Sequence, residues 1–340
     1  MLHANIRQAN VPDDLLPSGD GVSVLLVDSI YQSPSELDVT VEGHENPIAS
    51  DLDDTTGHGS NVLYTLAGLC RNAAFHFYRI LADDREAFRV SNFLKAFQYA
   101  IEQDIDVVNA SAGKWRPSCT TETECRLCTA ASELEEQGVC LVAGAGNRRT
   151  RDDTRSVFCP ARSEAAISVG TSIAKCTAQQ RTRAWGAGPI HPPGAYWVRH
   201  PDGYFNHLDE IDPEIAFGRD AYCTHMGCAP NQSCEVNQKE TPWEGNVTHS
   251  KTKPDILSPG LLFKQFWVGE GESTFVLDPG TSFSTPIVAG SVALVWSELK
   301  QSGYNPTPKD LKRAMLASAV DIDEGKVQRL NVDGMLSAFL

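Results

Sequence analysis

The stretch that decides the fold is Asp278-Pro279-Gly280-Thr281-Ser282-Phe283-Ser284-Thr285-Pro286, which runs directly into the apolar segment 287–296. We expect a turn at Gly280 to open a helix whose first turn contains Pro286. Ser282 would then lie at a helix N-terminus, where unpaired backbone N–H groups and the helix dipole favour negative charge. This is the placement of a nucleophile, although serine is also an ordinary helix cap.

The segment 287–296 is apolar on every side and rich in Ala, Gly and Ser. A helix on the surface of a domain would show one polar face, and this one does not. The pattern therefore predicts a helix buried inside a domain, which would hold Ser282 in a rigid position.

Apolar, β-rich runs alternate with helical patterns upstream of this helix. We predict strands at 22–27, 75–80, 106–111 and 139–143, and helices at 61–69, 90–103 and 125–137. Near the C-terminus the pattern predicts a capped amphipathic helix at 306–316 and a short strand at 327–332. Such alternation is typical of an α/β fold with a mostly parallel central sheet flanked by helices.

Length and charge limit the function classes. The chain has 340 residues, 41% of them hydrophobic, which is enough for one large α/β domain with its own core. A net charge of −15 argues against nucleic acid or an anionic membrane as the main partner, since both require clustered Lys and Arg. No apolar stretch reaches the ~18 residues of a membrane span, and no signal peptide precedes residue 22. We therefore expect a cytoplasmic protein, or alternatively a secreted mature domain.

Two further residues could cooperate with Ser282. Asp28 follows the strand 22–27, and the carboxyl ends of parallel strands line the functional crevice of such folds. His58 lies between Gly57 and Gly59 at the start of a helical pattern, so backbone and substrate could come close to its ring. An Asp at this place could also cap a turn, and any one of the nine histidines could be an ordinary surface or core residue.

Asp28, His58 and Ser282 together with three further motifs resemble the subtilisin-like serine proteases, or subtilases. The order Asp, His, Ser along the chain is similar to theirs, as are the motifs Asn109–Gly113, Val142–Asn147 and Lys253–Gly260. The resemblance implies a subtilisin-like three-layer fold and a serine endopeptidase that works through an acyl-enzyme. Asp28 would orient His58, which would act as the base for Ser282.

The resemblance also implies the rest of the site. The side-chain amide of Asn147 and the backbone N–H of Ser282 would stabilise the oxyanion. Two extended segments would line the cleft and bind an extended peptide substrate as an added strand: Ser111, Ala112 and Gly113 in one, and Ala143, Gly144 and Ala145 in the other.

We expect no cofactor and assign no metal ligand. The glycines at 144 and 146 do not form a dinucleotide-binding fingerprint. The predicted helix after His58 leads almost directly into the next strand, where subtilisins usually insert a calcium-binding loop. Ser29 follows Asp28 where the family often has Gly, and we expect this change to be tolerated.

We interpret residues 1–340 as a single peptidase domain that contains an inserted, Cys-containing segment at 178–252. The insertion could be a mini-domain that restricts substrates or docks a regulatory partner, or it could be a tolerated surface elaboration. Subtilases commonly carry a prodomain, yet 27 residues precede Asp28, so we expect either its removal or a different control.

The ten cysteines leave disulfides, free buried thiols and structural zinc open. The pair Cys125 and Cys128 has the spacing of a metal knuckle, with Cys119 nearby. A second group, Cys223, Cys228 and Cys234, could act with Cys176 or His225.

Two other functions remain open at this stage. One is a specialised processing or partner-activated protease with a narrow substrate range. The other is a catalytically silent protein that binds peptides on the same fold.

Overall fold

The computed structural model of the chain describes residues 5–6, 9–16, 18–30, 37–47, 57–81, 89–114, 119, 125–147, 157–174, 199–200, 203–204, 240–242, 253–269, 272–322 and 328–340. Most of the predicted insertion at 178–252 lies outside these residues, as do Cys176, Cys223, Cys228 and Cys234. Within the insertion the structure describes two short strands that pair antiparallel, β7 (Arg199–His200) and β8 (Gly203–Tyr204).

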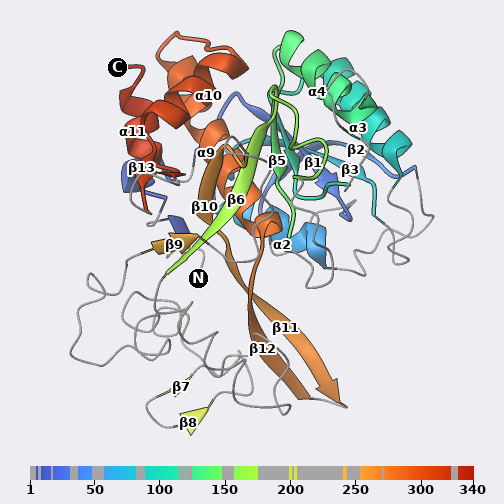
Figure 1. Cartoon of the computed structure of the whole chain (residues 1–340), viewed down its shortest axis with the longest axis vertical. Helices are drawn as coiled ribbons and strands as arrows, with labels where there is room; N and C mark the ends of the chain where they lie inside the picture. Colours follow the sequence, from blue (N-terminus) through green and yellow to red (C-terminus); the bar gives the residue numbers. More distant parts are fainter. Residues whose placement is uncertain are drawn as a thin grey trace.

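A large, mostly parallel sheet forms the centre of the molecule (Figure 1). Its strands lie in the order β13 (Val320–Asp321), β14 (Gln328–Arg329), β10 (Ile256–Pro259), β6 (Ile167–Ala174), β5 (Cys140–Gly144), β4 (Val107–Ala110), β1 (Ser23–Asp28), β3 (Ala74–Arg79) and β2 (Thr40–Glu45). β13 runs antiparallel to β14, and β9 (Glu240–Pro242) pairs antiparallel with β6. All other neighbours in this sheet are parallel.

Helices cover both faces of this sheet. One face packs against α2 (His58–Cys70) and α9 (Thr281–Gln301), and towards its edge against α10 (Pro308–Ala317) and α11 (Val332–Ser337). The other face packs against α3 (Val90–Glu102) and α4 (Arg126–Glu136). Alternate residues of β1 divide between the two faces: Val24 and Leu26 join the α9 core, while Leu25 and Val27 join the α3 core. The predicted three-layer α/β fold is confirmed.

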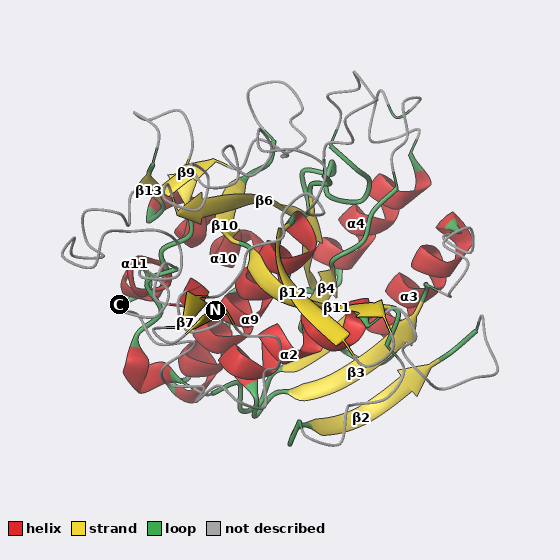
Figure 2. Ribbon diagram, turned by 90° about the horizontal axis from the view of Figure 1, so that it is seen from below, coloured by secondary structure: helices red, strands yellow, loops and turns green. Residues whose placement is uncertain are grey.

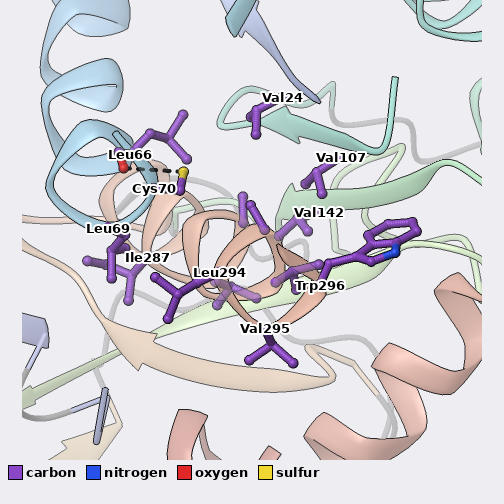
Figure 3. Packing of buried hydrophobic residues seen from close by; sticks show 14 of the residues in the cluster. Val24, Leu66, Leu69, Cys70, Val107, Val142, Ile287, Leu294, Val295 and Trp296 are labelled. Atoms are coloured by element: carbon purple, nitrogen blue, oxygen red, sulfur yellow. Dashed lines mark hydrogen bonds between the residues drawn. The ribbon is translucent and has the colours of Figure 1, made fainter. Parts of the chain in front are cut away.

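α9 is the buried helix that the sequence predicts. It lies beside α2 in both views (Figures 1 and 2), and side chains from both helices form one apolar cluster with the sheet (Figure 3). The contact needs Gly290, because a Cβ there would lie 2.9 Å from the Cβ of Leu69. The small residues of this helix therefore permit its close approach to α2.

The start of α9 differs from the prediction in one respect. Gly280 is the N-cap and Thr281 the first helical residue, so Pro286 lies in the second turn rather than the first. A proline there lacks the N–H that would bond the carbonyl of Ser282. The helix tolerates this because its neighbours on both sides hold it in place.

A hairpin that we did not predict precedes α9. β11 (Leu261–Gly269) and β12 (Glu272–Pro279) pair antiparallel in a two-stranded sheet of their own, which extends away from the main sheet (Figure 1). At its base the N–H of Gly280 donates to the carbonyl of Gly260. The hairpin therefore connects the end of β10 directly to the start of α9.

A buried ion pair precedes β10 and fastens its start to the neighbouring segment 163–168. Lys253 Nζ lies 2.8 Å from Asp255 Oδ2 and donates to the carbonyls of Ser163 and Ala166. The same Asp255 oxygen accepts from the N–H of Ser168 at 2.8 Å. Burial lowers the pKa of Lys253, with the charge of Asp255 opposing this effect. The start of the motif Lys253–Gly260 therefore stabilises the fold.

A 3-10 helix, Asp13–Leu15, precedes β1. The predicted cap of α10 is present: the Thr307 side chain accepts from the N–H of Asp310, whose carboxylate accepts from the N–H of Thr307. Among the helices that the structure describes, none combines the length and apolar character needed to cross a membrane.

Candidate active site

The candidate site residues gather where several parallel elements end or begin. β1 ends at Asp28, and β4 and β5 end just before Ser111 and Ala145. These three strands are neighbours and run in the same direction, so their carboxyl ends lie on one edge of the sheet. The helices α2 and α9 begin at His58 and Thr281 on the same edge.

Asp28 and His58 form a short hydrogen bond. His58 Nδ1 lies 2.7 Å from Asp28 Oδ1, and the Asp28 side chain is fully buried while that of His58 is 24% exposed. Asp28 Oδ1 also accepts from the backbone N–H of Ser29 at 2.8 Å. The carboxylate therefore fixes the direction of the ring.

Ser29 takes part in this arrangement, which we did not expect from the sequence. Its hydroxyl lies 3.3 Å from Asp28 Oδ1 and accepts from the N–H of Gly59 at 2.8 Å. It thereby joins the end of β1 to the start of α2. Gly59 is required here because a Cβ would lie 2.6 Å from the backbone nitrogen of Ile30. The glycine beside His58 thus permits the close approach that the sequence predicts.

Ser282 lies in the first turn of α9, partly exposed. Its hydroxyl donates to the carbonyl oxygen of Ser111 at 3.0 Å. The ring of Phe283, the next residue, lies 6.1 Å from the ring of His58. The structure therefore brings the starts of α2 and α9 together, with the Ser282 hydroxyl turned towards the cleft segment at 111.

Asn147 is held by the start of α9. Its Oδ1 accepts from the backbone N–H of Thr281 at 3.0 Å and from the Thr281 hydroxyl at 3.1 Å. The Thr281 hydroxyl in turn accepts from the N–H of Gly146 at 3.3 Å. With the oxygen held in this way, the exposed Asn147 keeps its amide Nδ2 as a hydrogen-bond donor.

The two predicted cleft segments differ in their surroundings. Ser111 is buried, while Ala112 and Gly113 are partly exposed and make no backbone hydrogen bond to another described residue. By contrast, Ala143 lies inside the sheet, paired with β4 on one side and with β6 on the other, and Gly144 pairs with β6. The backbone groups of Ala112 and Gly113 therefore have no partner among the described residues, whereas the backbone of Ala143 is paired on both sides.

His76 shows what an ordinary buried histidine looks like in this chain. It lies in β3 with 5% of its surface exposed, and its Nδ1 is 3.0 Å from the hydroxyl of Tyr99. Burial lowers the pKa of His76, with the charge of Glu42 opposing this effect. His76 is therefore a buried core residue with a hydrogen-bond partner.

The candidate site has two supporting residues that the sequence did not single out, Ser29 and Thr281. Each follows or precedes a predicted site residue directly, at 28 and 282. A Ser or Thr beside a catalytic candidate was the available signal, but a hydroxyl at a turn is usually only a local cap.

Comparison with known proteins gives one family. The model of the subtilase family matches residues 24–336. Subtilisin from Bacillus pumilus is 28% identical over 183 residues, which are 50% of this chain and 62% of that protein. Subtilisin E from Bacillus subtilis is 27% identical over 165 residues, or 45% of this chain and 41% of that protein. The matched region is thus less than two thirds of the length of these relatives.

Two solved structures share the fold. The prenylagaramide maturation protease PagA superposes with a TM-score of 0.60 at 18% identity, covering 100% of this chain and 98% of that chain. The protease domain of PatA superposes with a TM-score of 0.62 at 19% identity, covering 95% of this chain and 96% of that chain.

Proposed function

The chain belongs to the subtilase family, and we propose that it is a serine endopeptidase that hydrolyses peptide bonds through an acyl-enzyme. The observation that carries this proposal is the 2.7 Å hydrogen bond between Asp28 and His58 beside the first turn of α9. An oriented imidazole next to a serine at a helix N-terminus is the arrangement that activates a hydroxyl for attack.

In the proposed reaction His58 removes the proton of Ser282 as the hydroxyl oxygen attacks the carbonyl carbon of the substrate. His58 then returns this proton to the leaving amine, and a water molecule attacks the acyl-enzyme in the same way. Asp28 keeps the ring in the tautomer with a proton on Nδ1 and stabilises the imidazolium that forms. Its complete burial strengthens this interaction, because little solvent screens it.

Attack requires the Ser282 hydroxyl to leave its hydrogen bond to Ser111. A rotation about the Cα–Cβ bond of the serine would turn the hydroxyl from the Ser111 carbonyl towards His58. The carbonyl of Ser111 would then be free to accept from the backbone of a bound peptide. We therefore propose that substrate binding and activation of the serine are linked at this residue.

The oxyanion would be stabilised by two donors. One is Asn147 Nδ2. The two hydrogen bonds that Thr281 donates to Asn147 Oδ1 fix the orientation of this amide group. The other is the backbone N–H of Ser282, which lies in the first helical turn, where N–H groups have no partner within the helix. Removal of one such donor typically costs about 10²–10³ in rate.

The substrate would be an extended peptide that adds as a strand along Ser111, Ala112 and Gly113. The backbone groups of Ala112 and Gly113 have no partner among the described residues, which supports the proposal because strand addition relies on main-chain hydrogen bonds. Ala143, Gly144 and Ala145 would then form a wall of the cleft rather than a second strand partner.

The test is hydrolysis of an unstructured protein such as denatured casein and of a mixed peptide library, with products identified by mass spectrometry. We expect cleavage by the wild type and a loss of roughly 10⁶-fold, in practice to background, in Ser282→Ala and His58→Ala. The matched control is Ser291→Ala, which removes a buried hydroxyl from the same helix that has no partner among the described residues. This control should keep full activity.

Two other outcomes would change the assignment. Reactivity of Ser282 with an active-site reagent but no cleavage of general substrates would indicate a processing protease with a narrow range or a partner requirement. Tight peptide binding without reactivity or cleavage would indicate a silent binding protein and would refute the proposal.

A further inference from the structure

Four buried cysteines from three separate segments meet in one place on the α3 and α4 side of the sheet: Cys119, Cys125, Cys128 and Cys159, here called the four-cysteine cluster. Each is at most 3% exposed. Their sulfur atoms all lie within 4.8 Å of one another, and none of the four forms a disulfide. Cys159 lies 31 residues beyond Cys128, so only the fold brings it to the others.

The spacing of the sulfurs fits a single tetrahedral ion. Cys128 Sγ lies 3.8 Å from Cys119 Sγ and 3.7 Å from Cys159 Sγ. Cys125 Sγ lies 3.5 Å from Cys159 Sγ. Four sulfurs bound about 2.3 Å from one zinc ion would lie about 3.8 Å from each other. Sulfurs in a disulfide are about 2.0 Å apart, so the observed distances match the edges of a coordination tetrahedron better than covalent pairs.

We propose that the four-cysteine cluster is a structural zinc site in which all four thiolates bind one Zn²⁺ ion. The sequence alone assigned no metal ligand and left structural zinc open beside disulfides and free thiols. Four protein ligands leave no open position for water or substrate, and complete burial is typical of such closed sites. The proposal does not depend on the proposed protease activity.

The local structure suits thiolates. Cys125 is the N-cap of α4, and Cys128 lies in its first turn, where unpaired N–H groups and the helix dipole stabilise negative charge. Arg162 lies close enough to Cys159 to add a favourable charge. Because four thiolates and one Zn²⁺ carry a net charge of −2, both features offset the excess negative charge. Among the described residues the four cysteines belong to an apolar core cluster, which limits the access of water to the ion.

The site would tie together the segments that flank the proposed cleft. The backbone of Cys159 exchanges hydrogen bonds with Lys114, which directly follows the cleft residue Gly113. The neighbouring Phe158 donates its N–H to the carbonyl of Ala145, and its ring fills the space where a Cβ of Gly146 would lie. Zinc would therefore hold the two strand ends at 113 and 145 at a fixed separation.

The first experiment measures the metal content of the full chain, purified under reducing conditions through an affinity tag that binds no metal. We expect about one zinc ion per chain by elemental analysis. Replacement of zinc by Co²⁺ should give the visible absorption of a tetrahedral thiolate site. A folded wild type without metal, whether its cluster thiols are free or paired in disulfides, would overturn the proposal, and this result needs no variant.

The second experiment locates the ion with Cys125→Ser and Cys159→Ser. The matched controls are Cys70→Ser and Cys140→Ser, which remove buried thiols outside the cluster. Among the described residues neither control thiol belongs to a group of three or more possible metal ligands, so we expect neither to hold an ion. We expect the cluster variants to lose most of the zinc and the controls to keep it. Zinc retained in full by both cluster variants would place the metal elsewhere and refute the site.

Discussion

Substitution of Thr281 by Val tests how Asn147 is held. The hydroxyl of Thr281 is 3.1 Å from Asn147 Oδ1 and accepts from the N–H of Gly146, and the residue is 2% exposed. Val keeps the branched shape but makes neither bond. The backbone N–H of residue 281 still donates to Asn147 Oδ1, so the amide loses one of its two restraints.

The expected loss follows from one hydrogen bond between neutral groups, which contributes about 0.5–1.5 kcal/mol. If that restraint is lost in the transition state, kcat should fall by about 2–10-fold. KM should stay close to the wild-type value, because the oxyanion exists only in the transition state. The buried N–H of Gly146 also loses its acceptor, which should lower the free energy of unfolding by about 1–3 kcal/mol.

The assay is steady-state hydrolysis of a peptide that the wild type cleaves, with urea unfolding measured on the same samples. Thr281→Ser keeps the hydroxyl and should keep most of kcat. Thr285→Val removes a hydroxyl of the same helix that bonds the carbonyl of residue 281 rather than Asn147, so kcat should be nearly unchanged. An unaltered kcat in Thr281→Val, or a loss as large as that of Asn147→Ala, would refute the reasoning.

Three further substitutions test other parts of the account. Asn147→Ala should lower kcat by about 10²–10³ with little change in KM, measured by steady-state kinetics; a KM effect alone would contradict an oxyanion role. Asp255→Asn leaves the buried Lys253 unpaired and should lower the free energy of unfolding by about 3–5 kcal/mol, measured by urea titration; a neutral result would show that the pair is dispensable. Gly290→Val should cost about 1–3 kcal/mol in the same assay, since its Cβ meets Leu69, whereas Gly303→Ala, where nothing lies near the new Cβ, strains only the backbone.

The fold was predictable because its signals are local. Each buried parallel strand is a short apolar run, and each intervening helix has its own period, so both can be seen within windows of ten or so residues. The predicted strand 22–27 is found as Ser23–Asp28 and the predicted helix 90–103 as Val90–Glu102. The shift of Pro286 to the second turn of α9 could not be foreseen, because its cost is offset by packing around the helix.

The hairpin of β11 and β12 was missed despite a visible signal. Residues 261–268 and 274–277 are rich in β-branched and aromatic side chains on either side of a Gly-containing turn. Strand β2 was missed for another reason: it is an edge strand of mostly polar and partly exposed residues, with little apolar periodicity.

The candidate site was predictable in its residues but not in its supports. Asp28, His58 and Ser282 stand out by their position beside strand ends, glycines and a helix start. The hydroxyl of Ser29 accepts from the N–H of Gly59, which is 30 residues away in the sequence, so a local pattern does not predict this contact. The contact between Cys159 and Cys128 likewise forms only in the folded chain, and their spacing in the sequence does not predict it.

The most direct test of the account is labelling of the purified chain with a fluorophosphonate, which reacts only with a serine activated by its base. Mass spectrometry of the digested protein locates the adduct. We expect one adduct per chain, on Ser282, with labelling abolished in Ser282→Ala and His58→Ala and retained in Ser291→Ala. Absence of labelling in a folded wild type, or an adduct on another serine, would contradict the assignment of Asp28, His58 and Ser282 as a working catalytic triad.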